Sequence, residues 1–174
     1  MDVAALKKLA YEKMISNLDD MLKNYRQLLD LVRKEKDLLI TSNIDQLNDN
    51  NNAKEQVIIK IKALDAVRMT YAAELAHLVG ADTAQPRLLE IAQKIGGAEA
   101  EKLRTMHAAL EMVIKRLSEI NKTNVVYAES ALQTVNSALE NFKDTLLGQP
   151  KTYQQKGKYK QGSDTSGHLV TRKA

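Results

Sequence analysis

The chain has 174 residues, of which 44% are hydrophobic and only 4% aromatic, and it contains no cysteine and no tryptophan. The absence of cysteine excludes disulfides, thiolate metal ligands and a cysteine nucleophile. The net charge of +4 is concentrated after residue 147, where six Lys and Arg residues oppose the single Asp164. The remainder is nearly neutral, which argues against a basic nucleic-acid face on a folded body, and its aliphatic side chains suit helix-on-helix packing.

A first helix is predicted over residues 3–40. Its apolar residues follow alternating steps of four and three, which is the spacing of a heptad seam. Lys36 is the one interruption of this seam. The apolar members are Tyr11, Ile15, Leu18, Leu22, Tyr25, Leu29, Val32 and Leu39.

The segment TSNIDQL predicts a turn and a restart, with either Ser42 and Asp45 or Asn43 and Gln46 forming a capping box. A second helix is predicted from there to residue 79, with weak first turns across NDNNNAK because that segment is poor in helix formers. Gly80 is predicted to cap its C-terminus. The second seam consists of Val57, Ile61, Leu64, Val67, Tyr71, Leu75 and Leu78.

A short third helix is predicted over RLLEIAQKI, with Pro86 in its first turn and two glycines, Gly96 and Gly97, at its end. The last helix is predicted over residues 98–147. At 1.5 Å per residue it would span roughly 75 Å, which predicts an elongated antiparallel bundle or coiled coil of class all-α. The first half of this helix keeps one seam: Leu103, Met106, Leu110, Val113, Leu117 and Ile120.

The apolar pattern of the last helix then moves by one position. The old register continues into small and polar residues, whereas a new stripe begins one residue over. Asn121 and Asn124 lie at the changeover, where a stutter would locally unwind a supercoil and an amide paired with another amide or a backbone carbonyl would fix the register. The new stripe consists of Val125, Ala128, Leu132, Val135, Leu139, Phe142 and Leu146.

Two interpretations of the new stripe stay open. In the first, a straight helix drifts relative to a heptad repeat and its partners within the chain follow it. In the second, the stripe forms an apolar groove for a segment of another protein, bound by Val125, Leu132, Val135, Leu139, Phe142 and Leu146.

Residues 148–174 are rich in Gln, Lys, Gly and Ser and have no periodicity, so they are predicted to form a basic disordered tail after a helical rod of residues 1–147. The first residues contain no apolar run typical of a secretory signal. A run of about 18 apolar residues, which a membrane span requires, does not occur in the sequence. No membrane insertion is therefore expected.

Sequence motifs typical of catalytic or metal-binding sites are weak in this chain. His77, His107 and His168 are isolated, and Glu74 and His77 form the single Glu-x-x-His instance, whereas a di-iron bundle needs this motif on facing helices. Phosphate-binding loops and Ser/His/Asp constellations are absent. We therefore expect a protein that is not an enzyme and has no cofactor or metal.

Several segments occur in an order that is similar to one known family. They are NLDDMLKNYRQLLDLVRKEKDLLITSNIDQL, the stretch ending in LDAVR at Arg68, Gly80, the pair Asn121 and Asn124 followed by an aliphatic run, and Thr152-Tyr153 before Gly157. In this order they resemble the FlgN-type flagellar export chaperones of hook-associated proteins. Family members commonly carry a Tyr-Gly pair near the last of these, where this chain has Tyr153 and Gln154.

The resemblance implies a cytoplasmic chaperone that binds the disordered C-terminal segments of hook-associated proteins 1 and 3 at the hook–filament junction. It also implies delivery of this cargo to the flagellar type III export gate and ATPase, with Tyr153 as the residue expected to contact the export apparatus. The oligomeric state and the client preference do not follow from the sequence.

Three other interpretations remain beside the chaperone. The chain could be a structural coiled-coil oligomerisation module without a client. It could bind nucleic acid through Tyr153, Tyr159 and the lysines of the tail. A ferritin-like carboxylate enzyme is the third alternative, and the single Glu-x-x-His argues against it.

Overall fold

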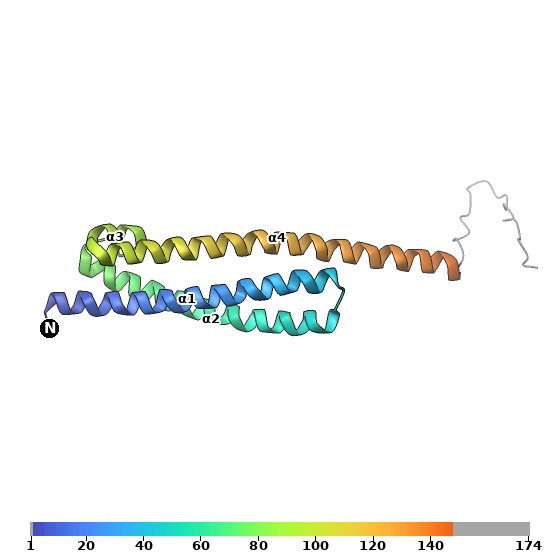
Figure 1. Ribbon diagram of the computed structural model, residues 1–174, viewed down its shortest axis with the longest axis horizontal. Helices are drawn as coiled ribbons and strands as arrows, with labels where there is room; N and C mark the ends of the chain where they lie inside the picture. The colour runs from blue at the N-terminus through green and yellow to red at the C-terminus, as the bar shows by residue number, and fades with distance from the viewer. Residues whose placement is uncertain (1, 148–174) are drawn as a thin grey trace, which may run out of the picture. The chain divides into compact units, whose positions relative to one another are not determined.

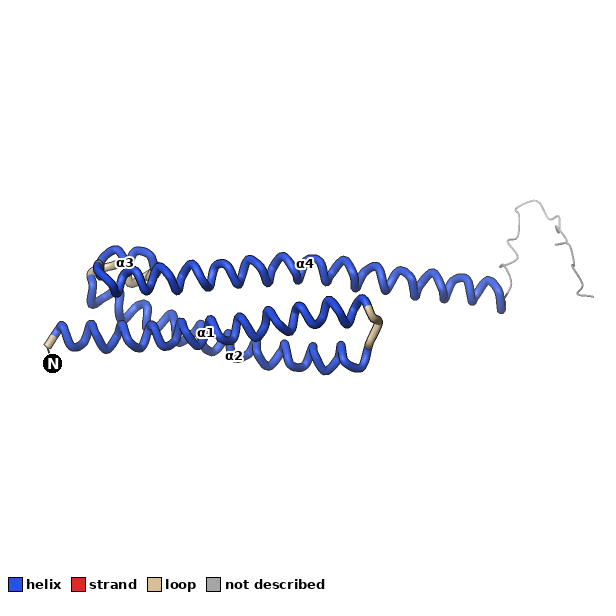
Figure 2. The backbone as a smooth tube through the Cα atoms, in the orientation of Figure 1, coloured by secondary structure: helices blue, strands red, loops and turns tan. Residues whose placement is uncertain are grey.

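Four α-helices make up the part of the chain that the computed structural model describes, which is the backbone of residues 2–147 and the side chains of residues 2–142. They are α1 (Val3–Ile40), α2 (Ile44–Val79), α3 (Leu88–Ile95) and α4 (Gly97–Leu147). Within residues 2–147 there is no strand, as Figures 1 and 2 show. The predicted all-α class is confirmed, whereas the predicted tail, residues 148–174, lies outside the described part.

The chain divides into two compact units, Met1–Gln133 and Thr134–Ala174. The first unit contains α1, α2, α3 and the larger part of α4, together with the hydrophobic core. The described part of the second unit is the end of α4, residues 134–147.

In the first unit α1 and α2 form an antiparallel hairpin (Figure 1). The Asn17 side-chain amide donates to the carbonyl of Leu64 (3.1 Å), and that of Asn50 donates to the carbonyl of Leu31 (3.0 Å). Residue numbers therefore rise along α1 as they fall along α2. At the turn, the Asn43 side chain accepts a hydrogen bond from the backbone N–H of Gln46 (3.2 Å), so Asn43, and not Ser42, is the N-cap of α2.

The first part of α4 runs parallel to α1. The Tyr11 hydroxyl donates to the carbonyl of Glu99 (3.3 Å) near the start of α4. Further along both helices, the Asn124 side-chain amide donates to the carbonyl of Val32 (2.9 Å). Consequently α2 is antiparallel to α1 and to this part of α4.

Helix α1 buries two heptad seams, of which sequence patterning predicted one. The predicted seam is confirmed, because Leu18, Leu22, Leu29 and Val32 are buried. The second seam lies one position before it and contains Asn17, which bonds to α2. Since α1 contacts both α2 and α4, it needs an apolar surface for each. The buried members of the second seam are Ala10, Met14, Asn17, Met21, Leu28 and Leu38.

All four helices contribute to the larger core cluster. Met14 and Leu18 of α1, Leu75 of α2, Ile91 of α3 and Leu103 of α4 are at most 1% exposed and belong to this cluster. Burying a large aliphatic side chain contributes about 1.5–3 kcal/mol. This cluster therefore fixes the short α3 and the start of α4 against the hairpin.

The loop before α3 starts with a left-handed glycine and delays the helix. Gly80 has φ +71°, and the N–H of Ala81 donates to the carbonyl of Ala76 (2.9 Å), which is a Schellman cap. The Asp82 side chain accepts bonds from two following backbone N–H groups and holds the chain in a turn. The prediction that Pro86 lies in the first turn of α3 is therefore wrong, because Arg87 is the N-cap and Pro86 precedes it.

Replacement of Gly80 by Ala is expected to lower the free energy of unfolding by about 1 kcal/mol, because a Cβ in the left-handed region is strained. The site is otherwise open, with no atom within 4 Å of an added Cβ, so backbone strain alone is measured. Gly80→Asn serves as the control, since Asn tolerates this conformation better. Thermal unfolding of the three proteins checks the order, and equal stability of Gly80→Ala and the wild type would contradict the strained cap.

Candidate functional site

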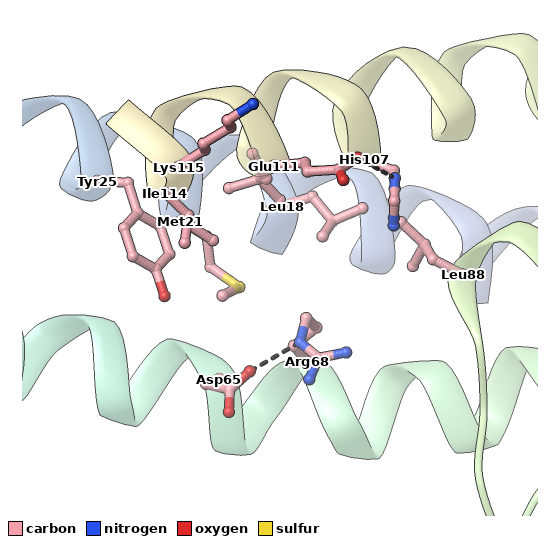
Figure 3. A pocket seen from close by; sticks show the side chains of 11 residues that line it. Leu18, Met21, Tyr25, Asp65, Arg68, Leu88, His107, Glu111, Ile114 and Lys115 are labelled. Carbon is pink, nitrogen blue, oxygen red and sulfur yellow. Dashed lines mark hydrogen bonds and ion pairs between the residues drawn. The ribbon is translucent and has the colours of Figure 1, made fainter. Parts of the chain in front are cut away.

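An open groove of about 640 Å³ lies in the first unit between α1, α2 and α4 (Figure 3). Side chains from α1 supply apolar surface, α2 and α4 supply walls, and Leu88 at the start of α3 marks one end. The lining residues are Leu18, Met21, Tyr25, Asp65, Arg68, Leu88, His107, Leu110, Glu111, Ile114 and Lys115.

The apolar part of the groove combines buried side chains of α1 with an exposed side chain of α4. Leu18 and Met21 are buried at its base, whereas Ile114 of α4 is 42% exposed. Burial, and secondarily the carboxylate of Asp65, raises the pKa of the Tyr25 phenol, while Arg68 opposes this shift. The hydroxyl of Tyr25 therefore remains protonated at neutral pH.

Charged and polar side chains form the rim. The Nε of Arg68 lies 2.8 Å from an Asp65 carboxylate oxygen on α2, and His107 Nδ1 lies 3.9 Å from a Glu111 carboxylate oxygen on α4. These pairs leave the apolar floor between them. An apolar base with charged edges is the arrangement that receives an amphipathic helix.

Helix α3 occupies the space beyond one end of the groove. Ile91 and Ala92 of α3 share the core cluster with Leu75 of α2 and Leu103 of α4. The groove begins at Leu88, on the first turn of α3. Over its eight residues α3 therefore supplies a fourth helix to the bundle, and the groove continues where no fourth helix of this chain lies among the described residues.

A polar layer of α1, α2 and α4 follows further along the bundle. The Asn124 side-chain amide, on a residue that is 3% exposed, donates to the carbonyl of Val32 and to a carboxylate oxygen of Glu35, both at 2.9 Å. Glu35 also forms an ion pair with Lys54 of α2. The side chains of Glu35 and Lys54 are only 13% and 17% exposed, so Asn124, Glu35 and Lys54 join all three long helices.

The two asparagines predicted to fix the register have different surroundings. Asn124 is buried and bonds to a backbone carbonyl of α1, which is the kind of partner expected for it. Asn121 is exposed. The register position of Asn121 therefore faces away from the core of its own unit, whereas Asn124 faces into it.

Asn124→Ala is expected to destabilise the protein by about 1–3 kcal/mol, because Glu35 and the Val32 carbonyl lose a donor inside the bundle. Asn121→Ala provides a matched control on the same helix, and a change within about 0.5 kcal/mol is expected for this exposed side chain. Chemical denaturation measures both. A larger loss for Asn121→Ala than for Asn124→Ala would contradict the assignment of the polar layer.

After Asn124 the side chains of α4 change character. In its first half the predicted seam is confirmed, with Leu103 and Leu110 buried and the others partly buried. In residues 125–133 of the first unit, Val125 and Leu132 are 49% and 62% exposed.

The described part of the second unit is likewise rich in exposed apolar side chains. Val135, Leu139 and Phe142 are between 55% and 62% exposed. Leu146 lies beyond the described side chains, and Tyr153 lies beyond the described residues. The expected cargo-binding residues that can be observed are thus all exposed.

The groove was missed by sequence patterning. Asp65 was assigned no role of its own, Arg68 appeared only at the end of the LDAVR segment, and Ile114 was outside the predicted seam. The available signal was the step of 11 residues from Ile114 to Val125, which places both in one heptad register.

Groups of metal ligands and membrane-spanning helices are not found among the described residues. Among residues 2–147 no three His, Asp or Glu side chains gather as metal ligands. None of the helices described is long and apolar enough to cross a membrane.

Comparison with known proteins supplies the family. A family described as FlgN protein matches residues 1–161 of the chain. Neither the curated proteins nor the solved structures contain a match.

Proposed function

This chain belongs to the FlgN family of flagellar export chaperones, and we propose that it binds the C-terminal segments of hook-associated proteins 1 and 3 through the end of α4. Chaperones of this family bind hook-associated proteins and are not enzymes. We call the proposed surface the client face. It consists of Val125, Leu132, Val135, Leu139, Phe142 and Leu146.

The observation that carries this proposal is the exposure of large aliphatic and aromatic side chains at heptad spacing. Leu132 and Phe142 are each 62% exposed, and Leu139 is 57% exposed. Contiguous apolar patches on a folded protein mark binding surfaces. A stripe at steps of three and four along a helix fits an amphipathic helix of a partner.

The same surface explains why binding can be reversible. An export substrate with an unfolded C-terminal segment orders that segment when it binds, and this ordering offsets about 2–5 kcal/mol of the interaction energy. Affinity then stays moderate although several apolar side chains are buried. Moderate affinity permits release of the client at the export apparatus.

We further propose that this occurs in the cytoplasm and that Tyr153, in the basic segment after α4, contacts the export gate or ATPase. Tyr153 is the residue that matches the family pattern. Tyr153→Ala is expected to leave client binding unchanged and to lower secretion of hook-associated proteins several-fold. Measurement of both quantities in flagellated cells separates delivery from binding. Loss of client binding in Tyr153→Ala would contradict the division of roles.

The test of the proposed function is co-purification of the full chain with the C-terminal segment of a hook-associated protein. A stable complex with this segment, and none with the same protein lacking it, is expected. If the full-length client and the truncated client bind equally, the proposed recognition of the C-terminal segment is wrong. If neither binds, the chain acts as a coiled-coil module without this client.

A further inference from the structure

One heptad line along α4 passes through both the groove and the client face. From Ile114 in the groove wall, steps of four and three lead through Ser118, Asn121 and Val125 to Leu132. We call this series the outer line. Its members are His107, Glu111, Ile114, Ser118, Asn121, Val125, Ala128, Leu132, Val135, Leu139 and Phe142.

The two ends of the outer line have complementary surfaces, because one borders a groove and the other carries exposed apolar side chains. Around Ile114 a groove of about 640 Å³ borders α4 and could receive an amphipathic helix. Around Leu132, and separately around Leu139, apolar side chains are exposed. Among the described residues, the groove is therefore not filled by a helix, and residues 125–142 are not covered by another helix.

We propose that a second copy of this chain fills the groove with residues 125–142 of its own α4, the two α4 helices running antiparallel. Leu132 of each copy then lies over Ile114 of the other. The same register opposes Ser118 to Ala128 and Asn121 to Val125. A two-fold axis relates the two copies, so each pair of opposed residues occurs twice and the assembly closes as a dimer.

Side-chain size supports this register. Ser118 and Ala128 are small and oppose each other, so the two helices can approach closely at this pair. Ile114 and Leu132 are large and lie where the groove provides volume. The exposed Asn121 then acquires a role that the fold of a single copy does not give it, since an amide beside Val125 near the axis favours one register over its neighbours.

Charge supports it as well. Residues 125–142 contain two acids, Glu129 and Glu140, and no Lys or Arg. In the antiparallel register Glu129 lies within one helical turn of Lys115 of the other copy, and Glu140 lies beside His107. Lys115 and His107 line the groove together with Arg68, Asp65 and Glu111, so the acidic segment meets Lys115 in a rim that carries both signs of charge.

The consequence for regulation rests on the proposed function. The dimer covers the client face, so the free chaperone shields its own apolar stripe and a client has to displace the second copy. The dimer itself depends only on the groove and on the outer line. The two proposals can therefore fail separately.

Sedimentation equilibrium of the full chain tests the dimer. A mass of twice the 19.5 kDa of one chain is expected at micromolar concentrations. Ile114→Asp on the groove side and Leu132→Asp on the opposite side are each expected to raise the dimer dissociation constant by at least tenfold, with the helical circular dichroism signal retained. A wild-type chain that sediments as a monomer, or two variants that stay fully dimeric, would overturn the proposal.

Disulfide trapping tests the register, and the chain offers a clean background because it has no cysteine. A mixture of Ile114→Cys and Leu132→Cys chains is expected to form the mixed disulfide in high yield. Met112→Cys replaces Ile114→Cys in the control, since Met112 is 72% exposed and lies outside the outer line. Equal trapping in the control, or efficient self-trapping of Leu132→Cys as in a parallel pair, would overturn the antiparallel arrangement.

The Ile114→Asp chain also distinguishes the dimer from the chaperone function, because its client face is unaltered. It is expected to bind the client's C-terminal segment at least as tightly as the wild type does. If the wild type dimerises and Ile114→Asp weakens the dimer as expected, but neither chain binds client, the proposed function fails and the dimer stands. If the Ile114→Asp chain binds client less tightly than the wild type, client displacement of the second copy is wrong.

Discussion

Leu132→Asp is expected to weaken binding of a client's C-terminal segment on the order of 100-fold, because it removes about 2 kcal/mol of apolar burial and buries a charge instead. Leu139→Asp is expected to act in the same direction. Leu132 is 62% exposed, so the core of the protein does not depend on it. Isothermal titration against the purified segment measures the affinity.

The chain provides a closely matched control for this substitution. Val126 is 63% exposed on the same helix but lies outside the outer line, and Val126→Asp is expected to change the affinity by less than about threefold, which is below 1 kcal/mol. Both variants are expected to keep their helical signal and to melt cooperatively. Loss of cooperative melting in Leu132→Asp would show that this residue belongs to the core instead.

Met14→Ala is expected to lower the free energy of unfolding by about 2–5 kcal/mol, because it leaves a cavity in the centre of the core. Met14 is fully buried in the cluster to which all four helices contribute. Met112→Ala is the matched control, since Met112 is 72% exposed on α4, and it is expected to change stability by less than about 0.5 kcal/mol.

Urea denaturation of the two methionine variants measures this contrast. The midpoint of Met14→Ala should fall clearly, whereas that of Met112→Ala should coincide with the wild type. Similar losses in both would mean that the exposed surface of α4 at Met112 carries more of the stability than its exposure indicates.

The helices were predictable because their signals are local. Asn43 and Gly80 cap α2 through their own side chain and backbone conformation, and each of these requirements is visible in a few consecutive residues. Pro86 was misplaced because the Asp82 turn precedes α3 and delays its start. A side-chain-to-backbone turn of this kind competes with the N-terminal proline signal, and residue types alone do not decide between them.

Packing between helices was predictable only in part. The second seam of α1 was missed because Asn17 and Glu35 lie in it, and polar residues break an apolar pattern. Asn17 bonds to a carbonyl of α2, and Glu35 bonds to Asn124 and Lys54. Their partners are distant in sequence, so only the fold explains why the seam accepts them.

The candidate site was likewise predictable only in part. Val125, Leu132, Val135, Leu139 and Phe142 are exposed, as is every described side chain from 125 to 142, so exposure identifies neither the stripe nor its occupant. The groove exists because, within residues 2–147, no fourth helix lies beside residues 65–68 of α2 and 107–115 of α4. Such an absence has no signature in the residues themselves.

The surfaces proposed for client binding and for self-association overlap, so the second copy protects the apolar stripe until a client binds. An apolar stripe that is always open would promote aggregation. A stripe that is covered by a second copy through a small interface is protected and still available to a client present at sufficient concentration.

Site-specific photo-crosslinking to the client's C-terminal segment tests the central claim most directly. Single cysteines at positions 126, 132 and 139 would each carry a benzophenone group in an otherwise cysteine-free chain. The account predicts strong adducts from positions 132 and 139 and little from position 126. Equal adducts from all three, or adducts from position 126 alone, would contradict a client face along Val125, Leu132, Val135 and Leu139.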